Sequence, residues 1–456
     1  MKAKFIYCLC LSAVLASSCS KDGNGNTPVE PVVPPVVEDP YAVELPNGNF
    51  EDGLEGWTVK KYANGDKTTV EVVEGQGVKD SRCLKIQQFP ENGKCCVGVE
   101  RKLTGLEPDQ MYRITARIRY SDIPNGEGTG PVVFSPNTKQ YWNSSKYIYG
   151  TELESWTNVV MDFMSDDNGE ATITAALGFW QGGMANGGRS TGTAYFDNIS
   201  VKKISDELFQ LESDHMRLYI EPTKVTISSQ ILSDWIEDLD GYYEACVELM
   251  GAAPHEGRKL AIQTTRGIYS GYWALAGYPI LWSINYTAVE DSFAKMKDYG
   301  DWCFGLLHEI GHVFNIGNTS WNWNDEMFAN FRMHYALEKT GGQVHQTDAN
   351  GESKVFVGEE ILNLYKPDYD KTIGTKVNDN GIHYMLARMS RNIGWEPYKK
   401  TFDYLRQNGG NGGSKYDKFV YFVNMLDRFT KETYPNVDLW SYFTDSELES
   451  IKKQLQ

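Results

Sequence analysis

The amino-acid sequence predicts a multidomain protein, in which an antiparallel β-sandwich precedes an α+β domain whose C-terminal half is mostly helical. Three observations predict this fold class. The chain has 456 residues, enough for two or three hydrophobic cores. A stretch rich in Pro, Gly and Asn separates the N-terminus from the rest. After about residue 205, hydrophobic residues change from a period of two to a period of three or four.

The first 19 residues have the form of a secretory signal. Lys2 and Lys4 precede an apolar run, which ends in small residues just before Cys19. This end resembles the lipobox of bacterial lipoproteins, in which the cysteine becomes the lipidated first residue of the mature chain. We therefore expect Cys19 to anchor the protein in a membrane, the outer membrane in particular. The alternative is an ordinary cleaved signal with an incidental cysteine.

Residues 20–42 are rich in Pro, Gly and Asn and cannot bury a core, so we expect a flexible tether. No later stretch reaches the roughly 18 apolar residues that a membrane span needs.

The charge balance excludes nucleic acid as a partner. The chain has 44 basic and 61 acidic residues, and its net charge of −17 repels polyphosphate.

Cysteine usage predicts one disulfide at most. Cys83 could pair with Cys95 or Cys96 in an oxidising compartment. Cys246 and Cys303 sit in apolar helical patterns and are expected to be small core residues.

Residues 43–204 are predicted to form the β-sandwich. Short segments such as 112–120, 171–175 and 195–201 alternate between apolar and polar residues and are bounded by turn residues.

The two ends of this segment resemble those of jelly-roll, galactose-binding-like carbohydrate-binding modules. The resemblance rests on Asn49–Gly53 with Trp57, and on Phe196-Asp197-Asn198. It implies a structural calcium ion between Glu51 and Asp197. Exposed aromatic side chains would contact the glycan, and the candidates are Tyr141, Trp142 and Trp180. Each of these rings could equally pack in the sandwich core.

Residues 205–456 are predicted to form the α+β domain. Three short apolar runs, at 215–220, 259–264 and 280–284, indicate strands, and apolar residues from Ile231 to Leu249 recur at helical spacing. Helical periodicity follows at 300–316, 325–338, 381–394, 397–406 and 416–430.

The motif that carries chemistry is HEIGH, within the apolar run from Cys303 to Phe314. On a helix, His308 and His312 lie one turn apart on one face and can bind one metal ion. Glu309 then lies beside the open coordination position, where its carboxylate can take a proton from water that the metal activates. Chance placement gives this pattern in roughly one chain in a hundred. The alternative is a helix face with two solvated histidines.

A catalytic zinc ion needs a third protein ligand, and Glu326 is the candidate. It follows His312 after 13 residues, enough for a loop and a returning helix, with Asn322 or Asn324 as the N-cap. The competitor is His334, about 12 Å further along the same helix.

Side chains that form hydrogen bonds to the outer ring nitrogens should orient the two histidines, and Asn330 and Asp325 are the candidates. His383 or Tyr384, on a later helix, are candidates to stabilise the oxyanion. A lone His on a helix is more often a structural group.

At these residues the chain resembles the enhancin-like, mucin-degrading zinc metallopeptidase family, of the gluzincin type. The resemblance spans about residues 210 to 430 and rests on HEIGH, on Asp325–Asn330 and on the Gly-rich segment Ser270–Pro279. It implies a zincin-type fold, zinc held by His308, His312 and Glu326, and Glu309 as base and later as acid. It also implies that the substrates are O-glycosylated, mucin-like proteins, whose glycans the sandwich would bind. The resemblance favours a location at the cell surface, although a periplasmic location fits the chemistry equally.

The leading hypothesis is therefore a tethered zinc endopeptidase that cuts glycoproteins. A general metallopeptidase without a glycan requirement is the first alternative. The second is a glycan-binding adhesin whose peptidase domain is inert.

Overall fold

The computed structural model describes residues 39–124, 128–136, 143–152, 155–179, 188–266, 273–284 and 287–456. The chain divides into Met1–Pro40 and Tyr41–Gln456, and the description below concerns the second unit. Four predicted positions lie outside the described residues: Cys19, Tyr141, Trp142 and Trp180. In the described part of the chain, no helix is long and apolar enough to cross a membrane.

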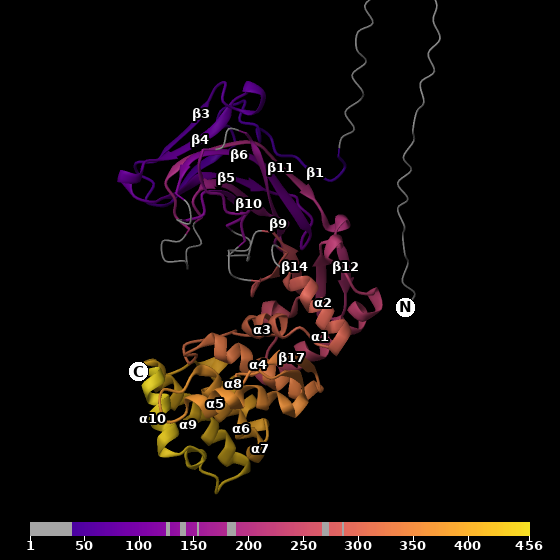
Figure 1. Ribbon diagram of the computed structural model, residues 1–456, viewed down its shortest axis with the longest axis vertical. Helices are drawn as coiled ribbons and strands as arrows, with labels where there is room; N and C mark the ends of the chain where they lie inside the picture. The colour runs from indigo at the N-terminus through magenta and orange to yellow at the C-terminus, as the bar shows by residue number, and fades with distance from the viewer. Residues whose placement is uncertain are drawn as a thin grey trace, which may run out of the picture. The chain divides into compact units, whose positions relative to one another are not determined.

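The expected antiparallel β-sandwich is confirmed (Figure 1). One sheet has the order β3-β4-β11-β6-β8, with β1 also on β11 and β9 also on β6, and the other has the order β2-β5-β10-β7. The strands of the first sheet are β1 (Ala42–Val43), β3 (Thr69–Val73), β4 (Cys83–Gln88), β6 (Met111–Ile123), β8 (Gly150–Glu152), β9 (Thr157–Met164) and β11 (Gly192–Lys203). Those of the second are β2 (Thr58–Ala63), β5 (Cys96–Leu103), β7 (Pro131–Phe134) and β10 (Ala171–Leu177).

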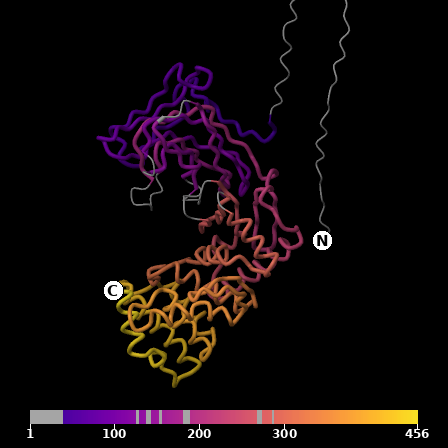
Figure 2. The backbone as a smooth tube through the Cα atoms, viewed as in Figure 1, coloured from indigo at the N-terminus to yellow at the C-terminus, as the bar shows by residue number. Residues whose placement is uncertain are grey.

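Alternation along β6 shows why this sequence forms a sandwich strand. Ile114, Ala116 and Ile118 are fully buried in the sandwich core, whereas Thr115 and Arg117 between them are partly exposed. The tube in Figure 2 shows the beginning and the end of this segment side by side, where Ala42 of β1 pairs with Lys202 of β11.

The disulfide expected at Cys83 is not formed, and this expectation is wrong. All five described cysteines are separate, buried thiols. Cys83 begins β4 in the first sheet, while Cys96 begins β5 in the second. The backbone of Cys95 pairs with that of Ser190 in an isolated antiparallel β-bridge. Cys246 and Cys303 are core residues, as predicted.

Glu51 and Asp197, the residues predicted to bind calcium, already have protein partners. The buried Asp197 carboxylate accepts hydrogen bonds from the backbone N–H of Val78 at 2.7 Å and of Asn198 at 2.6 Å. Glu51 accepts one from the backbone N–H of Arg82 at 3.0 Å. A calcium ion at this place stays a prediction.

The second part of the unit contains a five-stranded sheet in the order β12-β13-β14-β16-β15. The three inner strands are parallel, and the two edge strands are antiparallel to their neighbours. The strands are β12 (Phe209–Glu212), β13 (Met216–Ile220), β14 (Leu260–Thr265), β15 (Ala274–Leu275) and β16 (Ile280–Ser283). The amphipathic helix α1 (Ser229–Met250) connects β13 to β14, as its apolar spacing predicts.

The rest of the chain is mostly helical and contains one hairpin, β17 (Gln343–Thr347) with β18 (Ser353–Val357). Its helices are α2 (Ala288–Tyr299), α3 (Phe304–Val313), α4 (Asp325–Thr340), α5 (Ile361–Thr372), α6 (Asp379–Arg388), α7 (Ser390–Ile393), α8 (Glu396–Asn408), α9 (Lys415–Thr433) and α10 (Asp445–Leu455). The hairpin, α2, α5 and α10 were not expected from the periodicity.

The sandwich and the five-stranded sheet are joined by direct contacts. Tyr219 of β13 donates from its hydroxyl to the backbone oxygen of Asp109 at 3.1 Å, and Gln263 of β14 donates to that of Asp162, also at 3.1 Å. Met111 and Met164 of the sandwich also belong to the hydrophobic core of the second part. The sandwich therefore packs against the second part as one continuous structure.

Candidate metal centre

The candidate centre lies where α3 and α4 approach each other closely. Gly311 makes this approach possible, because a Cβ atom there would lie 2.5 Å from the backbone oxygen of Ala329. The backbone oxygen of Gly311 in turn accepts a hydrogen bond from the buried Arg332 of α4 at 2.9 Å. Asn324 caps α4, its side chain accepting from the backbone N–H of Met327 at 3.2 Å. One of the two predicted N-caps is thus the residue that begins the helix.

Three side-chain atoms converge between the two helices. Nε2 of His308 lies 3.1 Å from Nε2 of His312. Oε2 of Glu326 lies 3.1 Å from the former and 3.4 Å from the latter. His308, His312 and Glu326 form a group of ligand atoms that all lie within 4.8 Å of one another.

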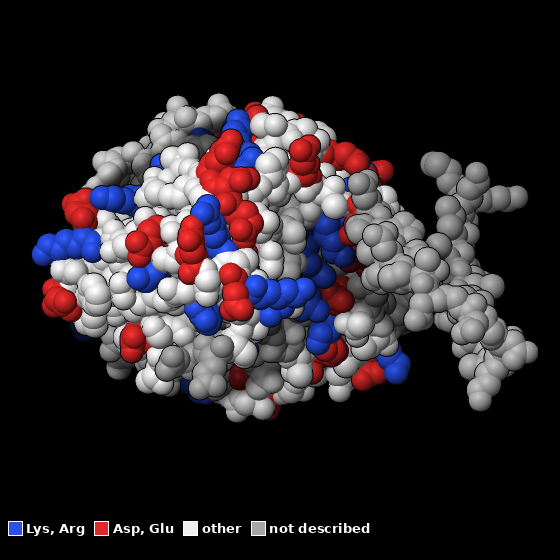
Figure 3. All heavy atoms as spheres, turned by 90° about the horizontal axis from the view of Figure 1, so that it is seen from above, with Lys and Arg blue, Asp and Glu red and all other residues white. Residues whose placement is uncertain are grey.

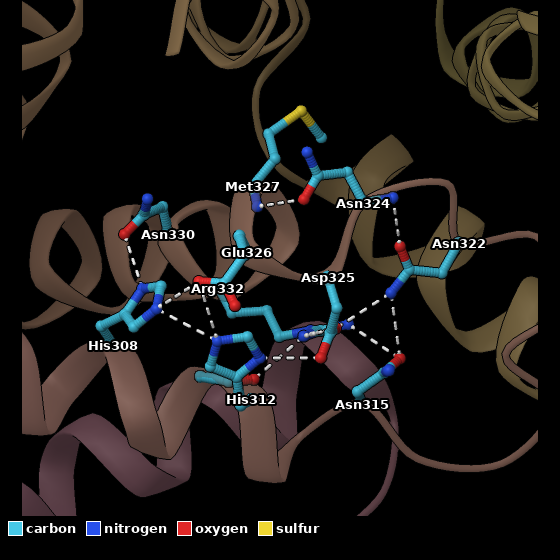
Figure 4. A network of polar contacts seen from close by, with 11 residues as sticks. His308, His312, Asn315, Asn322, Asn324, Asp325, Glu326, Met327, Asn330 and Arg332 are labelled. Carbon is cyan, nitrogen blue, oxygen red and sulfur yellow. Dashed lines mark hydrogen bonds and ion pairs between the residues drawn. The ribbon is translucent and has the colours of Figure 1, made fainter. Parts of the chain in front are cut away.

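The opposite nitrogens of both rings face protein oxygens (Figure 4). Nδ1 of His308 lies 2.8 Å from Oδ1 of Asn330, and Nδ1 of His312 lies 2.7 Å from Oδ2 of Asp325. A carboxylate only accepts hydrogen bonds, so Nδ1 of His312 carries a proton and donates it. Asn330 and Asp325, the two residues expected from the sequence to orient the histidines, thus each lie against one of the rings.

This arrangement leaves three acceptors facing one another. With the proton on Nδ1, a neutral imidazole presents the lone pair of Nε2, and here two such lone pairs face a carboxylate oxygen. A cation at their centre makes this arrangement favourable. Tetrahedral ligands at about 2.0–2.1 Å from one ion lie roughly 3.3 Å apart, close to the three separations seen here. Two imidazoles and a carboxylate fit a zinc ion.

The electrostatics of the group favour a positive charge between the two helices. Burial alone would lower the pKa of His312, but hydrogen bonds with Asp325 and Glu326 raise it to about 9. The two histidines lower the pKa of Glu326 well below its ordinary value. The surroundings of His312 and Glu326 therefore favour a positive charge at this place.

Glu309 occupies the next position on α3 and lines a pocket of about 610 Å³ together with His308. Burial raises its pKa, although the nearby histidines and a hydrogen bond from the backbone N–H of Ala276 oppose the shift. A half-buried carboxylate with a raised pKa suits a group that accepts and returns a proton.

The same pocket contains Trp273, a ring that is 37% exposed and packs against Gly305. A Cβ atom at Gly305 would lie 1.6 Å from this ring. Hydrogen-bonding side chains from α2 and β17 complete the wall, with Asp291, Lys295 and Gln346 among them. The sequence patterns did not single out these three, because they come from a helix and an unexpected hairpin that only the fold brings to the pocket.

His383 and Tyr384, the candidates for oxyanion stabilisation, lie elsewhere. His383 is fully buried, and its Nε2 lies 2.9 Å from Nδ1 of the equally buried His334. Tyr384 packs on Tyr369. Neither His383 nor Tyr384 lines the pocket beside Glu309. His334, the competitor for the third ligand, belongs to this separate buried pair.

A polar network behind the ligands was also not predicted (Figure 4). Oδ1 of Asp325 accepts a hydrogen bond from Asn322 at 3.0 Å and lies 3.4 Å from the Arg332 guanidinium. Burial would raise the pKa of Asp325, but these partners and His312 lower it. Arg332 is fully buried, and a helical pattern alone gives no signal that distinguishes it from a surface arginine.

Residues 202–445 match the family described as peptidase M60, enhancin and enhancin-like. This range contains both helices of the candidate centre. The comparison with curated proteins found no match.

Carbohydrate-binding modules are among the solved structures similar to the sandwich. The module TmCBM61, in complex with β-1,4-galactotriose, is 17% identical, with a TM-score of 0.25, over 35% of this chain and 97% of that one. The second xylan-binding CBM22 domain of Xyn10C from Paenibacillus barcinonensis is 16% identical, with a TM-score of 0.24, over 34% of this chain and 96% of that one. A sugar-binding protein candidate from Bacteroides thetaiotaomicron is 13% identical, with a TM-score of 0.21, over 32% and 87%.

Proposed function

The chain belongs to the peptidase M60, enhancin and enhancin-like family, and from this premise we propose that it is a zinc-dependent endopeptidase acting on O-glycosylated, mucin-like proteins. The observation that supports the zinc site is the convergence of three possible ligand atoms, from His308, His312 and Glu326, which a cation at their centre would hold together.

A bound zinc ion would supply a Lewis acid that acidifies water and polarises a peptide carbonyl. Glu309 takes the proton from the attacking water and returns it to the nitrogen of the leaving amine. The raised pKa of its carboxyl supports both transfers. Asn330 and Asp325 hold the two histidine rings in the orientation that presents Nε2.

The pocket beside Glu309 supports a substrate larger than a peptide alone. Its volume of about 610 Å³ exceeds that of any amino-acid side chain, and it combines the exposed ring of Trp273 with hydrogen-bonding groups. These are the features that recognise a sugar ring on a peptide. Lipidation at Cys19, and with it attachment to the outer membrane at the cell surface, remains part of the proposal.

The test is to measure bound zinc and cleavage of an O-glycosylated mucin and of its deglycosylated form. The proteins compared are the wild type, Glu309→Gln, and Glu359→Gln as a control at an exposed acid far from HEIGH in the sequence. We expect one zinc ion per chain in all three. The rate with Glu309→Gln should fall by about 10²- to 10⁴-fold, and the control should be unaffected.

The alternatives give different results. Equal cleavage of both substrate forms would indicate a general metallopeptidase. Zinc binding without any cleavage would favour an adhesin with an inert peptidase domain. Absence of zinc, or full activity of Glu309→Gln, would make the assignment of the centre wrong.

A further inference from the structure

A second cavity, of about 520 Å³, lies at the edge of the sandwich. Its walls come from the segment before β8, from the beginning of β9 and from Arg266, which follows β14 of the second part. Cavities where two parts of a protein meet often bind small molecules, and this volume is within their usual range. The cavity contains none of the residues of the candidate metal centre.

Tyrosine side chains dominate this cavity, with Tyr120, Tyr147 and Tyr149 in its lining. The Tyr120 hydroxyl donates to the backbone oxygen of Tyr149 at 2.8 Å, and the Tyr149 hydroxyl donates to that of Gly128, also at 2.8 Å. Two of the three rings are therefore held in place before any ligand arrives. Fixed tyrosine rings offer apolar faces on which a sugar ring can pack at low entropic cost.

The charges of the lining are all positive. Lys146 and Arg266 contribute to it, and no Asp or Glu does so among the described residues. This contrasts with the net charge of −17 of the chain and with the mixture of acidic and basic side chains on the face shown in Figure 3. Arg266 forms an ion pair with Glu221, whose Oε2 lies 3.1 Å from Nη1 of Arg266. Lys146 is exposed and is the cation most open to a ligand.

We propose that this cavity binds an anionic sugar, one that carries a carboxylate or a sulfate group. The tyrosine rings pack against the sugar, and Lys146 binds the anionic group, with Arg266 beside it. Asn158, the second residue of β9, has an exposed side-chain amide that can form a hydrogen bond with a hydroxyl group of the sugar.

The cavity is connected to the candidate metal centre by a short length of chain. Arg266 lines this cavity and Trp273 lines the pocket of Glu309, and seven Cα-to-Cα steps along the chain join them. An extended chain covers about 3.3–3.6 Å per residue, so the two Cα atoms lie at most about 25 Å apart. The bound sugar would thus hold a glycoprotein close to the catalytic pocket. Sugar binding at this cavity does not depend on the proposed peptidase activity.

The experiment is calorimetric titration of the full chain, without added zinc, with 3′-sialyllactose, 3′-sulfolactose and lactose. Lys146→Ala removes the exposed charge without touching the core. Asn158→Trp fills the cavity from an exposed position. Lys452→Ala, at an exposed lysine on α10, is the matched control for loss of one surface charge.

We expect both anionic sugars to bind more tightly than lactose. Lys146→Ala should weaken both by about tenfold, because one charge-assisted hydrogen bond is lost. Asn158→Trp should abolish binding, and Lys452→Ala should change nothing. Weakening of one anionic sugar alone would identify which of the two anionic groups the cavity takes.

Three results would overturn the proposal. The first is no binding of either anionic sugar at about 10 mM, which is weaker than any useful affinity. The second is equal binding of lactose. The third is undiminished binding by both Lys146→Ala and Asn158→Trp. Because no peptide bond is cut in this assay, a failure here is separate from a failure of the proposed peptidase.

Discussion

Oδ2 of Asp325 lies 2.7 Å from Nδ1 of His312, and this contact decides which nitrogen of the ring faces the candidate metal centre. The carboxylate accepts the Nδ1 proton, which leaves the lone pair of Nε2 for a metal ion. Asn330 has the same relation to His308 at 2.8 Å.

The first prediction concerns this contact. Asp325→Ala removes the acceptor, so the ring of His312 can take the wrong tautomer or rotate. We expect zinc affinity to fall by about 10- to 100-fold, measured by competition with a chelator. Asp325→Asn keeps one acceptor oxygen and should lose less. Equal affinities for all three proteins would show that the contact has no part in orienting the ring.

The second prediction separates the two candidates for the third ligand. Glu326→Gln should lose zinc at concentrations where the wild type is saturated, because a neutral amide replaces the anionic ligand. His334→Gln should keep it, since His334 is buried against His383. Metal content after dialysis measures both. Loss of zinc from His334→Gln in a protein that remains folded would contradict the assignment of Glu326.

The third prediction concerns the close approach of α3 and α4. In Gly311→Ala the new Cβ would lie 2.5 Å from the backbone oxygen of Ala329, so the helices must separate. We expect a loss of about 1–3 kcal/mol in the free energy of unfolding, and weaker zinc binding, because α4 carries Glu326. Urea unfolding measures the first effect and chelator competition the second.

Gly241→Ala is the control for this prediction. Gly241 lies inside α1, and a Cβ there would meet only Cγ2 of Thr340 at 3.8 Å, an ordinary contact. This variant should be as stable as the wild type, or more stable by about 0.5–1 kcal/mol. If Gly311→Ala behaved in the same way, the close approach would not require glycine.

The fourth prediction concerns the buried pair His334 and His383. Burial lowers the pKa of His334 and lowers that of His383 well below its ordinary value. Glu338, 3.4 Å from Nε2 of His334, opposes the shift of that residue, so His383 carries the larger effect.

The direction of the pH dependence of stability follows from the pH range in which the folded and the unfolded chain each bind protons. Above about pH 6.5, the ordinary histidine pKa, both rings are neutral in the folded and the unfolded chain, and the stabilising effect is fully present. As the pH falls below this value, only the unfolded chain takes up protons, and stability is lost by up to about 1.4 kcal/mol per pH unit for each ring. Urea unfolding at several pH values measures the slope.

His383→Gln removes one of these protons, so its stability should depend less on pH than that of the wild type. The comparison between the two proteins cancels the contribution of every other titratable group, because both proteins contain them. Identical slopes would mean that His383 is not held neutral by burial.

Local pattern in the sequence was sufficient for most of the elements and for the core of the candidate site. Period-two alternation indicated the sandwich strands, and apolar spacing indicated α1, α3, α4, α6, α8 and α9, because burial of one face imposes a period on the chain. The spacing within HEIGH placed His308 and His312 one turn apart, and the N-terminal turn of α4 supplied Glu326.

The features that only the tertiary structure decided are contacts between residues far apart in the sequence. Asp325 and Asn330 were candidates to orient the histidines, but only the packing of α3 on α4 assigned one to each ring. The same packing put His383 beside His334 in the core, where the sequence had suggested an oxyanion role. Cys83 and Cys96 were separated because their strands belong to different sheets. Period and spacing describe one element at a time, whereas these contacts arise when two elements exclude water between them.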